Sequence, residues 1–301
     1  MPNAAPNAAR LTVGVISAGR VGSVLGAALA RAGHHVIAAT AVSDASRARA
    51  ERLIPQAELA PAERVADLAE LLILAVPDDT LPGLVQGLAD TGHFAPGRIV
   101  AHVSGSHGIG VLEPATAHGA LALALHPVMT FTGRGEDLER LSGISFGVTA
   151  PEPARVIAEA LVVEMGGEPE FIREEHRALY HAGLTHGANH LVTLVNEACD
   201  VLRAAGVLMP ERMIAPLLSA ALDNTLRLGD AALTGPVSRG DVGTVAAHLD
   251  ALVAEAPDSV AAYVALARRT ADRAIDNHRL TPEAAEPLLG VLADRPQEKS
   301  S

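Results

Sequence analysis

Residues 11–31, LTVGVISAGRVGSVLGAALAR, join a short apolar run to a helical stretch through a turn that contains two glycines. The first part, LTVGVI, is apolar and contains the β-branched residues typical of strands, whereas GSVLGAALAR has the Ala and Leu content of a helix. A strand that passes directly into a helix is the first unit of a sheet whose strands are joined by helical crossovers. The stretch therefore predicts that the fold begins at Leu11.

The alternation of strand and helix continues to about residue 172. Helical stretches separate most of the further apolar runs, which are HHVIAAT, LLILAV, RIVAHV, ALALAL, SFGVTA and PEFI. LLILAV is apolar at every position, which is typical of a strand covered by helices on both faces. We therefore expect an α/β fold over residues 11–172, a doubly wound, mostly parallel Rossmann sheet with LLILAV at its centre.

No strand pattern follows Arg173. Helices are expected at 174–205, 210–228, 241–254, 258–277 and 282–293, several of which begin at Pro or Asp and end before Gly. The sequence thus predicts an all-α C-terminal domain over residues 173–295. Residues 1–10 and 296–301 are expected to be a disordered leader and a disordered tail.

The composition excludes several classes of function. The net charge is −12 and the Lys and Arg residues form no basic run, so a nucleic-acid partner is not expected. No run of 18 or more apolar residues and no signal-peptide pattern occurs, so we expect no membrane partner and a cytoplasmic location. The chain has one cysteine and no HExxH motif, so we expect no metal site.

The turn between the first strand and the first helix resembles a dinucleotide-binding fingerprint. In G-x-G-x-x-G the glycines permit a tight turn, close approach of the backbone to a pyrophosphate, and packing of helix on strand. Here the second and third glycines are present and a serine replaces the first. The candidate cofactor-binding residues are Ser17, Ala18, Gly19, Arg20, Val21 and Gly22. The alternative is an ordinary turn that uses glycine for packing.

The residues after HHVIAAT favour NADP over NAD. An NAD site normally has an acidic residue at the end of the second strand, whereas an NADP site offers Arg and small polar groups to the 2′-phosphate. Ser43 and Arg47 suit a 2′-phosphate, although Asp44 keeps NAD open. The alternative is that these are solvated helix residues.

Polar residues follow three of the central strands, at the carboxyl edge where open α/β sheets bind ligands. Val76, Pro77 and Asp78 follow LLILAV and are expected beside the nicotinamide, or else simply precede a helix capped by Asp79. Ser104 is a candidate to hydrogen-bond a substrate carboxylate. His126 is a candidate proton donor, because histidine titrates near neutral pH. A structural role is the alternative for the histidines of this region.

Two further candidate groups lie in the helical half. His186 and Asn189 belong to a polar stripe with a spacing of three and four residues, and His190 is adjacent to it. Their short hydrogen-bonding side chains suit a substrate cleft, or alternatively a helix interface. Arg239 and Asp241 are candidate substrate-binding residues, because Arg binds a carboxylate through two hydrogen bonds. The alternative for Asp241 is a helix cap.

The assembled motifs resemble those of bacterial Rossmann-like proteins that carry the domain DUF2520. The similarity runs from Leu11 to about Ala271, and its specific parts are SAGRVG, LLILAVPDD, HVSGSHG, ALHPVMTFTG, LYHAGLTHGANHLVTL and ALTGPVSRGDVGTVAAHL. That family is similar to pyrroline-5-carboxylate reductase and to the 6-phosphogluconate and 3-hydroxyisobutyrate dehydrogenases, whose helical C-terminal domains usually dimerise. The resemblance therefore implies an NADP-dependent oxidoreductase and a homodimer formed by the C-terminal helices.

The resemblance also suggests roles for individual residues. In the hydroxyisobutyrate group a helix carries Lys-x-x-Asn-Asn, and on this chain the Lys position falls on His186 and the Asn positions on Asn189 and His190. His126-Pro127 is similar to the His-Pro of prephenate dehydrogenases. Some relatives are ketopantoate reductases of a second type.

These observations combine into one expected reaction. Hydride from NADPH is expected to reach the carbonyl or imine carbon of a small carboxylate-bearing substrate, with ketopantoate the first candidate. His186, aided by Asn189 and His190, is expected to protonate the product, with His126 as the competing donor and with Ser104 and Arg239 on the carboxylate. The alternatives are a reductase of the imine or pyrroline-5-carboxylate type and a non-catalytic dinucleotide-binding sensor.

Overall fold

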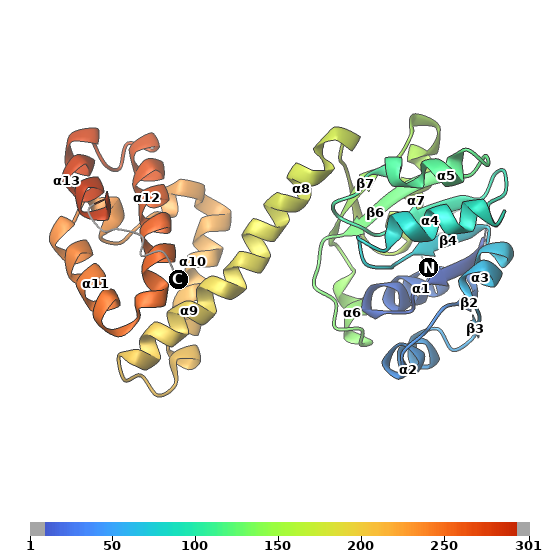
Figure 1. Ribbon diagram of the computed structural model, residues 1–301, viewed down its shortest axis with the longest axis horizontal. Helices are drawn as coiled ribbons and strands as arrows, with labels where there is room; N and C mark the ends of the chain where they lie inside the picture. Colours follow the sequence, from blue (N-terminus) through green and yellow to red (C-terminus); the bar gives the residue numbers. More distant parts are fainter. Residues whose placement is uncertain (1–9, 294–301) are drawn as a thin grey trace, which may run out of the picture. The chain divides into compact units, whose positions relative to one another are not determined.

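The computed structural model describes residues 10–293, and the predicted leader and tail lie outside these residues except for Arg10. The chain forms two compact units, one ending at Thr185 and one beginning at His186. The first unit contains an eight-stranded sheet in the order β3-β2-β1-β4-β5-β6-β7-β8 (Figure 1). Its strands are β1 Thr12–Ile16, β2 His35–Ala39, β3 Glu58–Leu59, β4 Leu71–Leu74, β5 Ile99–His102, β6 Leu121–Pro127, β7 Ser145–Thr149 and β8 Glu168–Phe171.

Helices cover both faces of this sheet (Figure 1). Alternate residues of the central strands enter two separate cores: Val15 and Ile73 pack with α1 and α7, whereas Leu72 and Leu74 pack with α3 and α4. This division follows from the two-residue period of a strand, and it explains why β4 is apolar at every position. The helices of the unit are α1 Arg20–Arg31, α2 Asp44–Leu53, α3 Ala62–Leu68, α4 Leu81–Asp90, α5 Glu113–Thr116, α6 Glu136–Arg140, α7 Arg155–Glu164 and α8 Arg177–Leu184.

The predicted α/β fold with a doubly wound, mostly parallel sheet is confirmed. The sheet order reverses direction between β1 and β4, which is the point where such sheets bind ligands at the carboxyl ends of their strands. β7 runs antiparallel to β6, and every other pairing is parallel. The sequence did not predict β3, because both residues of this short edge strand are exposed and show no apolar alternation.

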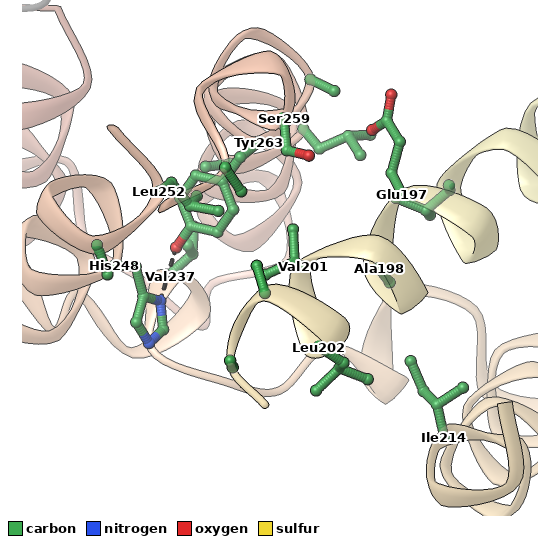
Figure 2. Close-up of a pocket in the computed structure, with 18 of the residues that line it drawn as sticks. Glu197, Ala198, Val201, Leu202, Ile214, Val237, His248, Leu252, Ser259 and Tyr263 are labelled. Carbon is green, nitrogen blue, oxygen red and sulfur yellow. Dashed lines mark hydrogen bonds between the residues drawn. The ribbon is translucent and has the colours of Figure 1, made fainter. Parts of the chain in front are cut away.

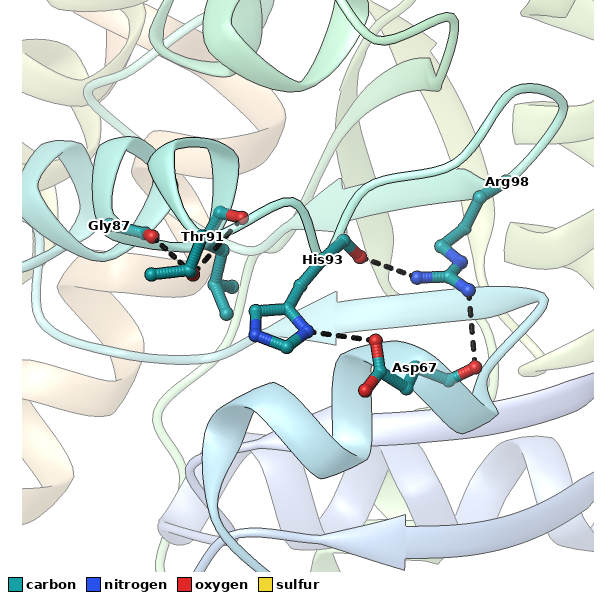
Figure 3. A network of polar contacts seen from close by, with 6 residues as sticks. Asp67, Gly87, Thr91, His93 and Arg98 are labelled. Atoms are coloured by element: carbon teal, nitrogen blue, oxygen red, sulfur yellow. Dashed lines mark hydrogen bonds and ion pairs between the residues drawn. The ribbon is translucent and has the colours of Figure 1, made fainter.

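A polar network joins the loops at the opposite edge of the sheet. His93 Nδ1 lies 2.8 Å from Asp67 Oδ1, and Arg98 donates to the carbonyl oxygens of His93 at 2.6 Å and Asp67 at 3.2 Å (Figure 3). Thr91 caps the preceding helix by donating to the Gly87 carbonyl oxygen at 2.7 Å. These bonds tie the end of α3 to the connection between α4 and β5, so this edge has a structural role.

The first position of the fingerprint adopts a backbone conformation that favours glycine. Ser17 has a φ of +74°, in the left-handed region. Its N–H donates to Thr40 Oγ1 at 2.7 Å, and the Ala18 N–H donates to the Thr40 carbonyl oxygen at 2.7 Å. The β1–α1 turn therefore keeps the glycine conformation although serine stands at this position, and two hydrogen bonds to Thr40 hold it.

We expect Ser17→Gly to stabilise the first unit by about 0.5–1 kcal/mol, because glycine adopts a positive φ without steric cost. The backbone bond to Thr40 is retained in the variant. Urea denaturation followed by circular dichroism measures the change. A decrease in the free energy of unfolding would show that the interactions of the Ser17 side chain stabilise the protein by more than the positive φ of this residue costs.

The second unit is entirely helical over its described residues. Its helices are α9 His190–Ala204, α10 Pro210–Leu228, α11 Val242–Glu255, α12 Val260–Asp276 and α13 Pro282–Ala293. Leu249, Ala271 and Leu288 are fully buried in a core shared by α11, α12 and α13. In contrast, the only buried residue that α10 contains is Pro210. Within residues 10–293, no helix is both long and apolar enough to cross a membrane.

The predicted helix over 174–205 is divided into several segments. A 3-10 turn at Glu174–His176 precedes α8, and a π-helical turn at Thr185–Asn189 separates α8 from α9. The compact units divide at Thr185, whereas the sequence predicted a boundary near Ile172. The difference arises because Arg177 of α8 is buried in the first unit.

Candidate active site

The turn between β1 and α1 presents backbone N–H groups at a helix end. α1 begins at Arg20, and the residue before it, Gly19, provides no side-chain cap. The N–H groups of a first helical turn lack partners inside the helix and attract anions. A Cβ atom on Gly22 would overlap the Ser17 carbonyl oxygen, whereas one on Gly19 would approach only the Ser17 hydroxyl, at 3.5 Å. Backbone packing therefore requires Gly22, and Gly19 leaves open space at the helix end.

Three arginine side chains meet at one loop beside this turn. The buried Asp137 carboxylate accepts two backbone hydrogen bonds, both at 2.8 Å, and so fixes the loop at Gly133. A Cβ atom on Gly133 would lie 2.8 Å from Arg49 Cδ and 3.0 Å from Arg20 Cγ. Arg52 donates to the Gly133 carbonyl oxygen at 3.1 Å. The loop thus gathers positive charge next to the start of α1, which the sequence analysis did not foresee.

The predicted 2′-phosphate residues lie at the start of α2. The Ser43 hydroxyl accepts a hydrogen bond from the Ser46 N–H at 3.2 Å and caps this helix. Arg47 is exposed, and its guanidinium lies 3.5 Å from the Val42 carbonyl oxygen. Between the end of β2 and Ser43 the sequence has no Asp or Glu, which is where an NAD site normally has its carboxylate. The role of Ser43 and Arg47 stays a prediction.

Asp78 and the loop after β5 form a hydrogen-bonded group at the carboxyl edge of the sheet. Ser106 donates to Asp78 Oδ2 at 2.6 Å, and Ser104 Oγ lies 3.3 Å from Ser106 Oγ. Burial raises the pKa of Asp78, but the hydrogen bonds from Ser106 and Ser104 outweigh it and leave this pKa lowered. Asp78 is therefore ionised at neutral pH. Ser104 is buried, and its Oγ also accepts from the His107 N–H at 3.2 Å.

His102 forms hydrogen bonds with both ends of this loop. Its ring is fully buried, with Nε2 at 2.8 Å from the Gly108 carbonyl oxygen and Nδ1 accepting from the Ser104 N–H at 3.2 Å. Burial lowers the pKa of His102 to about 4. The neutral ring thus has a defined tautomer, with its proton on Nε2, and it holds the two ends of the loop together.

His126 lies at the end of β6, with its ring against α8. Its Nδ1 atom is 2.8 Å from the Tyr180 hydroxyl oxygen, and its ring is edge-on to that of His181. A Cβ atom on Gly105 would be 2.6 Å from His181 Cδ2 and 2.9 Å from His126 Nε2, so both rings pack against Gly105 and require glycine there. Burial lowers the pKa of His126 to about 4, with Arg177 acting in the same direction. His126 is therefore a neutral imidazole at pH 7.

Arg177 fixes the backbone around this histidine. Its side chain is 1% exposed, and its guanidinium donates to the carbonyl oxygens of Ser104 at 2.7 Å, His107 at 2.9 Å and Gly147 at 3.0 Å. Its carbon Cζ also lies 5.4 Å from the centre of the Tyr180 ring. Arg177 thus connects α8 to the Ser104–His107 loop and to β7.

His186, Asn189 and His190 lie in or beside the π-helical turn of the chain. All three side chains are exposed, and the Nδ1 atoms of His186 and His190 are 3.0 Å apart. The rings meet edge to face, with centroids 5.2 Å apart. π-helical turns are rare and often occur at functional sites. The polar residues here are spaced by three and four positions, which predicts a regular α-helix and not a π-helical turn.

Arg239 lines a small polar cavity of about 440 Å³ in the helical unit, together with Arg279, Thr234, Ser238 and Leu233. Two guanidinium groups in one cavity favour an anionic ligand. Asp241 instead caps α11, because its carboxylate accepts from the Thr244 N–H at 3.2 Å and from the Thr244 hydroxyl at 2.7 Å.

A larger apolar cavity of about 870 Å³ lies between α9, α10, α11 and α12. Figure 2 shows Val201 of α9 on the side of Tyr263, whereas Leu202 lies on the side of Ile214. The Tyr263 hydroxyl lies 2.9 Å from His248 Nδ1. Apart from this pair the lining is mostly aliphatic.

Comparisons with known proteins identify both parts of the chain. Residues 2–127 match the family model of a Rossmann-like domain, and residues 144–270 match that of a domain of unknown function, DUF2520. These two regions are thus similar to a Rossmann-like domain and to a DUF2520 domain, respectively. The resemblance seen in the motifs is thereby confirmed. The DUF2520 match begins before β7, so it includes Gly147, Arg177 and Tyr180 as well as the helical unit. None of the curated proteins matches the chain.

Solved structures share the fold of these two domains. A protein from Bacteroides fragilis assigned as an NADP oxidoreductase has a TM-score of 0.72 at 21% identity, with 87% of this chain and 98% of that chain covered. An imine reductase from Pseudomonas sp. has a TM-score of 0.61 at 19% identity, covering 90% and 99%. A pyrroline carboxylate reductase from Plasmodium falciparum with NADP bound has a TM-score of 0.55 at 11% identity, covering 92% and 98%.

The structure brings together part of the predicted site and adds residues that the sequence analysis missed. Asp78, Ser104 and His126 all lie at the carboxyl edge of the Rossmann-like domain. Tyr180 and Arg177 of the DUF2520 domain complete their surroundings. A signal for Tyr180 existed, since it is one of two tyrosines in the chain and lies in the motif LYHAGLTHGANH.

The fully buried His102 and the partly buried His126 predict how stability depends on pH. His102 and His126 have folded pKa values of about 4, below the ordinary value of 6.5. Above pH 6.5 neither state binds these protons, and between pH 6.5 and 4 the unfolded chain binds protons that the folded protein excludes. As the pH falls from 6.5 to 4, the free energy of unfolding should decrease by up to about 3 kcal/mol for each histidine.

Urea denaturation at pH 7 and pH 4.5 measures this effect. His126→Asn should weaken the pH dependence, and His35→Asn, at an exposed position, is the matched control. An unchanged free energy of unfolding across the window would contradict the burial of these rings as neutral groups.

Proposed function

We propose that the chain is an NADPH-dependent oxidoreductase that reduces the carbonyl or imine carbon of a small substrate bearing a carboxylate. The observation that carries this proposal is the position of His126 and Asp78. Both lie at the carboxyl edge of the sheet, in the same compact unit as the Ser17–Gly22 turn, where open α/β sheets bind ligands. The descriptions of the structural neighbours as an NADP oxidoreductase, an imine reductase and an NADP-bound pyrroline carboxylate reductase support the same class.

The residues of the turn fit a dinucleotide. The uncapped start of α1 and the open space at Gly19 suit the pyrophosphate. Arg20 and Arg49, together with the predicted Ser43 and Arg47, would hold the 2′-phosphate of NADP. Val76, Pro77 and Asp78 would flank the nicotinamide. When bound, NADPH supplies the hydride.

Two histidines are candidates for the proton that the reduced substrate takes up. His186, with Asn189 and His190, corresponds to the Lys-x-x-Asn-Asn pattern. His126 is the competing donor, and its neutral ring lies beside the ionised Asp78 group. For either residue, replacement by Asn should lower turnover by about 10²–10⁴-fold if it is the donor, while NADPH affinity stays nearly unchanged. Measuring both variants with one substrate decides between them.

A small anionic substrate is supported by the cavity at Arg239 and Arg279. Ketopantoate is the first candidate, and Ser104 is the predicted partner of its carboxylate in the Rossmann-like domain. A substrate of the pyrroline-5-carboxylate type is the second candidate, supported by the two structural neighbours described as an imine reductase and a pyrroline carboxylate reductase.

The test is the rate of NADPH oxidation with ketopantoate, with pyrroline-5-carboxylate and with a panel of small keto acids and imines. We expect turnover with one of these classes and a preference for NADPH over NADH. Arg47→Ala and Arg20→Ala should reduce that preference. Binding of NADPH without turnover of any panel member would indicate a non-catalytic dinucleotide-binding protein and would overturn the proposal.

We also propose that the DUF2520 domain forms a homodimer through α10 and α9. α10 has Met213, Leu217, Leu222 and Leu226 exposed by 64%, 68%, 53% and 78%. Pro210 is the only buried residue of α10, so this apolar face is left exposed to water in the single chain. Exposed apolar faces of this kind mark protein–protein interfaces. Leu217 also lines the large apolar cavity, which extends the same surface between the helices.

Leu217→Glu should shift the protein from dimer to monomer, because it places a charge in the proposed apolar interface. Leu208→Glu is the matched control, since Leu208 is 96% exposed and lies outside the helices. Sedimentation velocity measures both. A wild-type protein that sediments as a monomer would refute the proposed dimer.

A further inference from the structure

Tyr180 is placed to exchange a proton with His126. Its hydroxyl oxygen is 2.8 Å from His126 Nδ1, and the two rings meet edge to face at 87°. Gly147 makes room for this hydroxyl, because a Cβ atom at that position would overlap the Tyr180 oxygen. The pair is thus built from three elements, namely α8, β6 and β7.

The surroundings of Tyr180 favour a hydroxyl that donates its proton to His126. Burial raises the pKa of Tyr180, and the Arg177 guanidinium and the Gly147 backbone oppose this rise. The Tyr180 hydroxyl packs against Gly147 and its ring faces the positive charge of Arg177. A protonated phenol in these surroundings is a better donor than acceptor toward His126.

This direction fixes the tautomer of His126. With Nδ1 accepting from Tyr180, the ring proton lies on Nε2, the atom that packs against Gly105. The groups around the ring are Arg177 and His181 of α8 and Asp78 after β4. His126 therefore carries its N–H on Nε2, in a neutral ring at the carboxyl edge of the sheet.

We propose that Tyr180 is a positioning and proton-relay residue that supplies, through His126, the proton consumed in the reduction. This proposal rests on the proposed function and selects His126 over His186 as the donor. The substrate carbon accepts the hydride and its two electrons, and the C=O π bond becomes the lone pair of an alkoxide. The alkoxide takes the Nε2 proton, and Nδ1 takes the Tyr180 proton, so the imidazole stays neutral.

The negative charge ends on the Tyr180 oxygen, beside the Gly147 backbone and near the Arg177 guanidinium. An alkoxide is a stronger base than a phenolate, so the transfer is favourable. The relay resets when solvent protonates Nε2 and the Nδ1 proton returns to Tyr180. No oxidant or reductant other than NADPH is needed.

Tyr180→Phe tests the relay, because it removes the hydroxyl and keeps the ring. Tyr263→Phe is the matched control: it also removes a hydroxyl hydrogen-bonded to a histidine Nδ1, at 2.9 Å from His248, but in the apolar cavity of the helical unit. We expect Tyr180→Phe to lower kcat by about 10–10²-fold with KM values nearly unchanged, and Tyr263→Phe to leave both unchanged. Added to His126→Asn, Tyr180→Phe should cause no further loss.

A second readout does not depend on turnover. Nitrogen-15 NMR of the imidazole rings should show His126 protonated at Nε2 in the wild type and a mixture of tautomers in Tyr180→Phe. A wild-type His126 protonated at Nδ1, or rate losses that multiply in the double variant, would overturn the relay. The two proposals can fail separately. If NMR shows the expected tautomer but no substrate of the panel is reduced, the proposed function is wrong and the relay has no role in turnover. The direction of the hydrogen bond from Tyr180 to His126 would still hold.

Discussion

Replacement of Arg177 by Met should lower the free energy of unfolding of the Rossmann-containing unit by about 3 kcal/mol or more. The variant keeps much of the buried volume but removes the donors to the carbonyl oxygens of Ser104, His107 and Gly147. Each buried acceptor left without a partner costs about 1–3 kcal/mol. The loss should be accompanied by faster hydrogen exchange in the Ser104–His107 loop, because Arg177 connects this loop to β7.

Arg173→Met is the matched control. Arg173 is exposed and pairs with Glu175 at 3.3 Å, so its replacement should change stability by no more than about 0.5 kcal/mol. Urea denaturation followed by circular dichroism compares the two variants. Equal effects would mean that water replaces the guanidinium of Arg177 without a loss of stability. The three hydrogen bonds of Arg177 to backbone carbonyl oxygens would then not stabilise the loop.

Replacement of Gly22 by Ala should have the second large effect, and it should act on both stability and cofactor affinity. The new Cβ atom would overlap the Ser17 carbonyl oxygen and lie 2.9 Å from the Ala75 Cβ atom, and neither can move without displacing β1 or the end of β4. Overpacking of this kind costs about 1–3 kcal/mol or more. A shifted α1 no longer aims its N–H groups at the pyrophosphate, so NADPH affinity should fall by about 100-fold.

Gly19→Ala separates the two effects. Its Cβ atom would approach only the Ser17 hydroxyl, at 3.5 Å, so the stability of the unliganded protein should be nearly unchanged. The same methyl group fills the open space at the start of α1 and should weaken NADPH binding. Thermal unfolding and NADPH fluorescence titration measure the two quantities. A Gly19→Ala protein that binds NADPH as tightly as the wild type would remove the turn from the proposed site.

The sequence was sufficient for the parts of the fold that depend on local pattern. LLILAV predicted the fully buried β4, and the SAGRVG turn was placed correctly between β1 and α1. The left-handed φ of Ser17 was not predictable, because serine in this position depends on hydrogen bonds to Thr40, 23 residues away. β3 was missed because its two residues pair at an edge without burying an apolar side chain.

The candidate site shows the same limit. Asp78, Ser104 and His126 were predicted because each lies at or after the carboxyl end of a strand, and this rule needs only the strand positions. Tyr180 lies 54 residues after His126, and only the packing of α8 against β6 and β7 brings them together. The burial of Arg177 follows from the same packing, and no local helical pattern around this residue indicates it.

A crystal structure of the full chain with NADP⁺ bound would show whether the dinucleotide occupies the Ser17–Gly22 turn. We expect the pyrophosphate to contact the backbone N–H groups at Gly19, Arg20 and Val21. We also expect the nicotinamide C4 atom to lie beside Asp78 and His126, so that one substrate carbonyl group can contact both C4 and His126 Nε2. A dinucleotide bound away from the Ser17–Gly22 turn, or a nicotinamide ring directed away from His126, would contradict the proposed site.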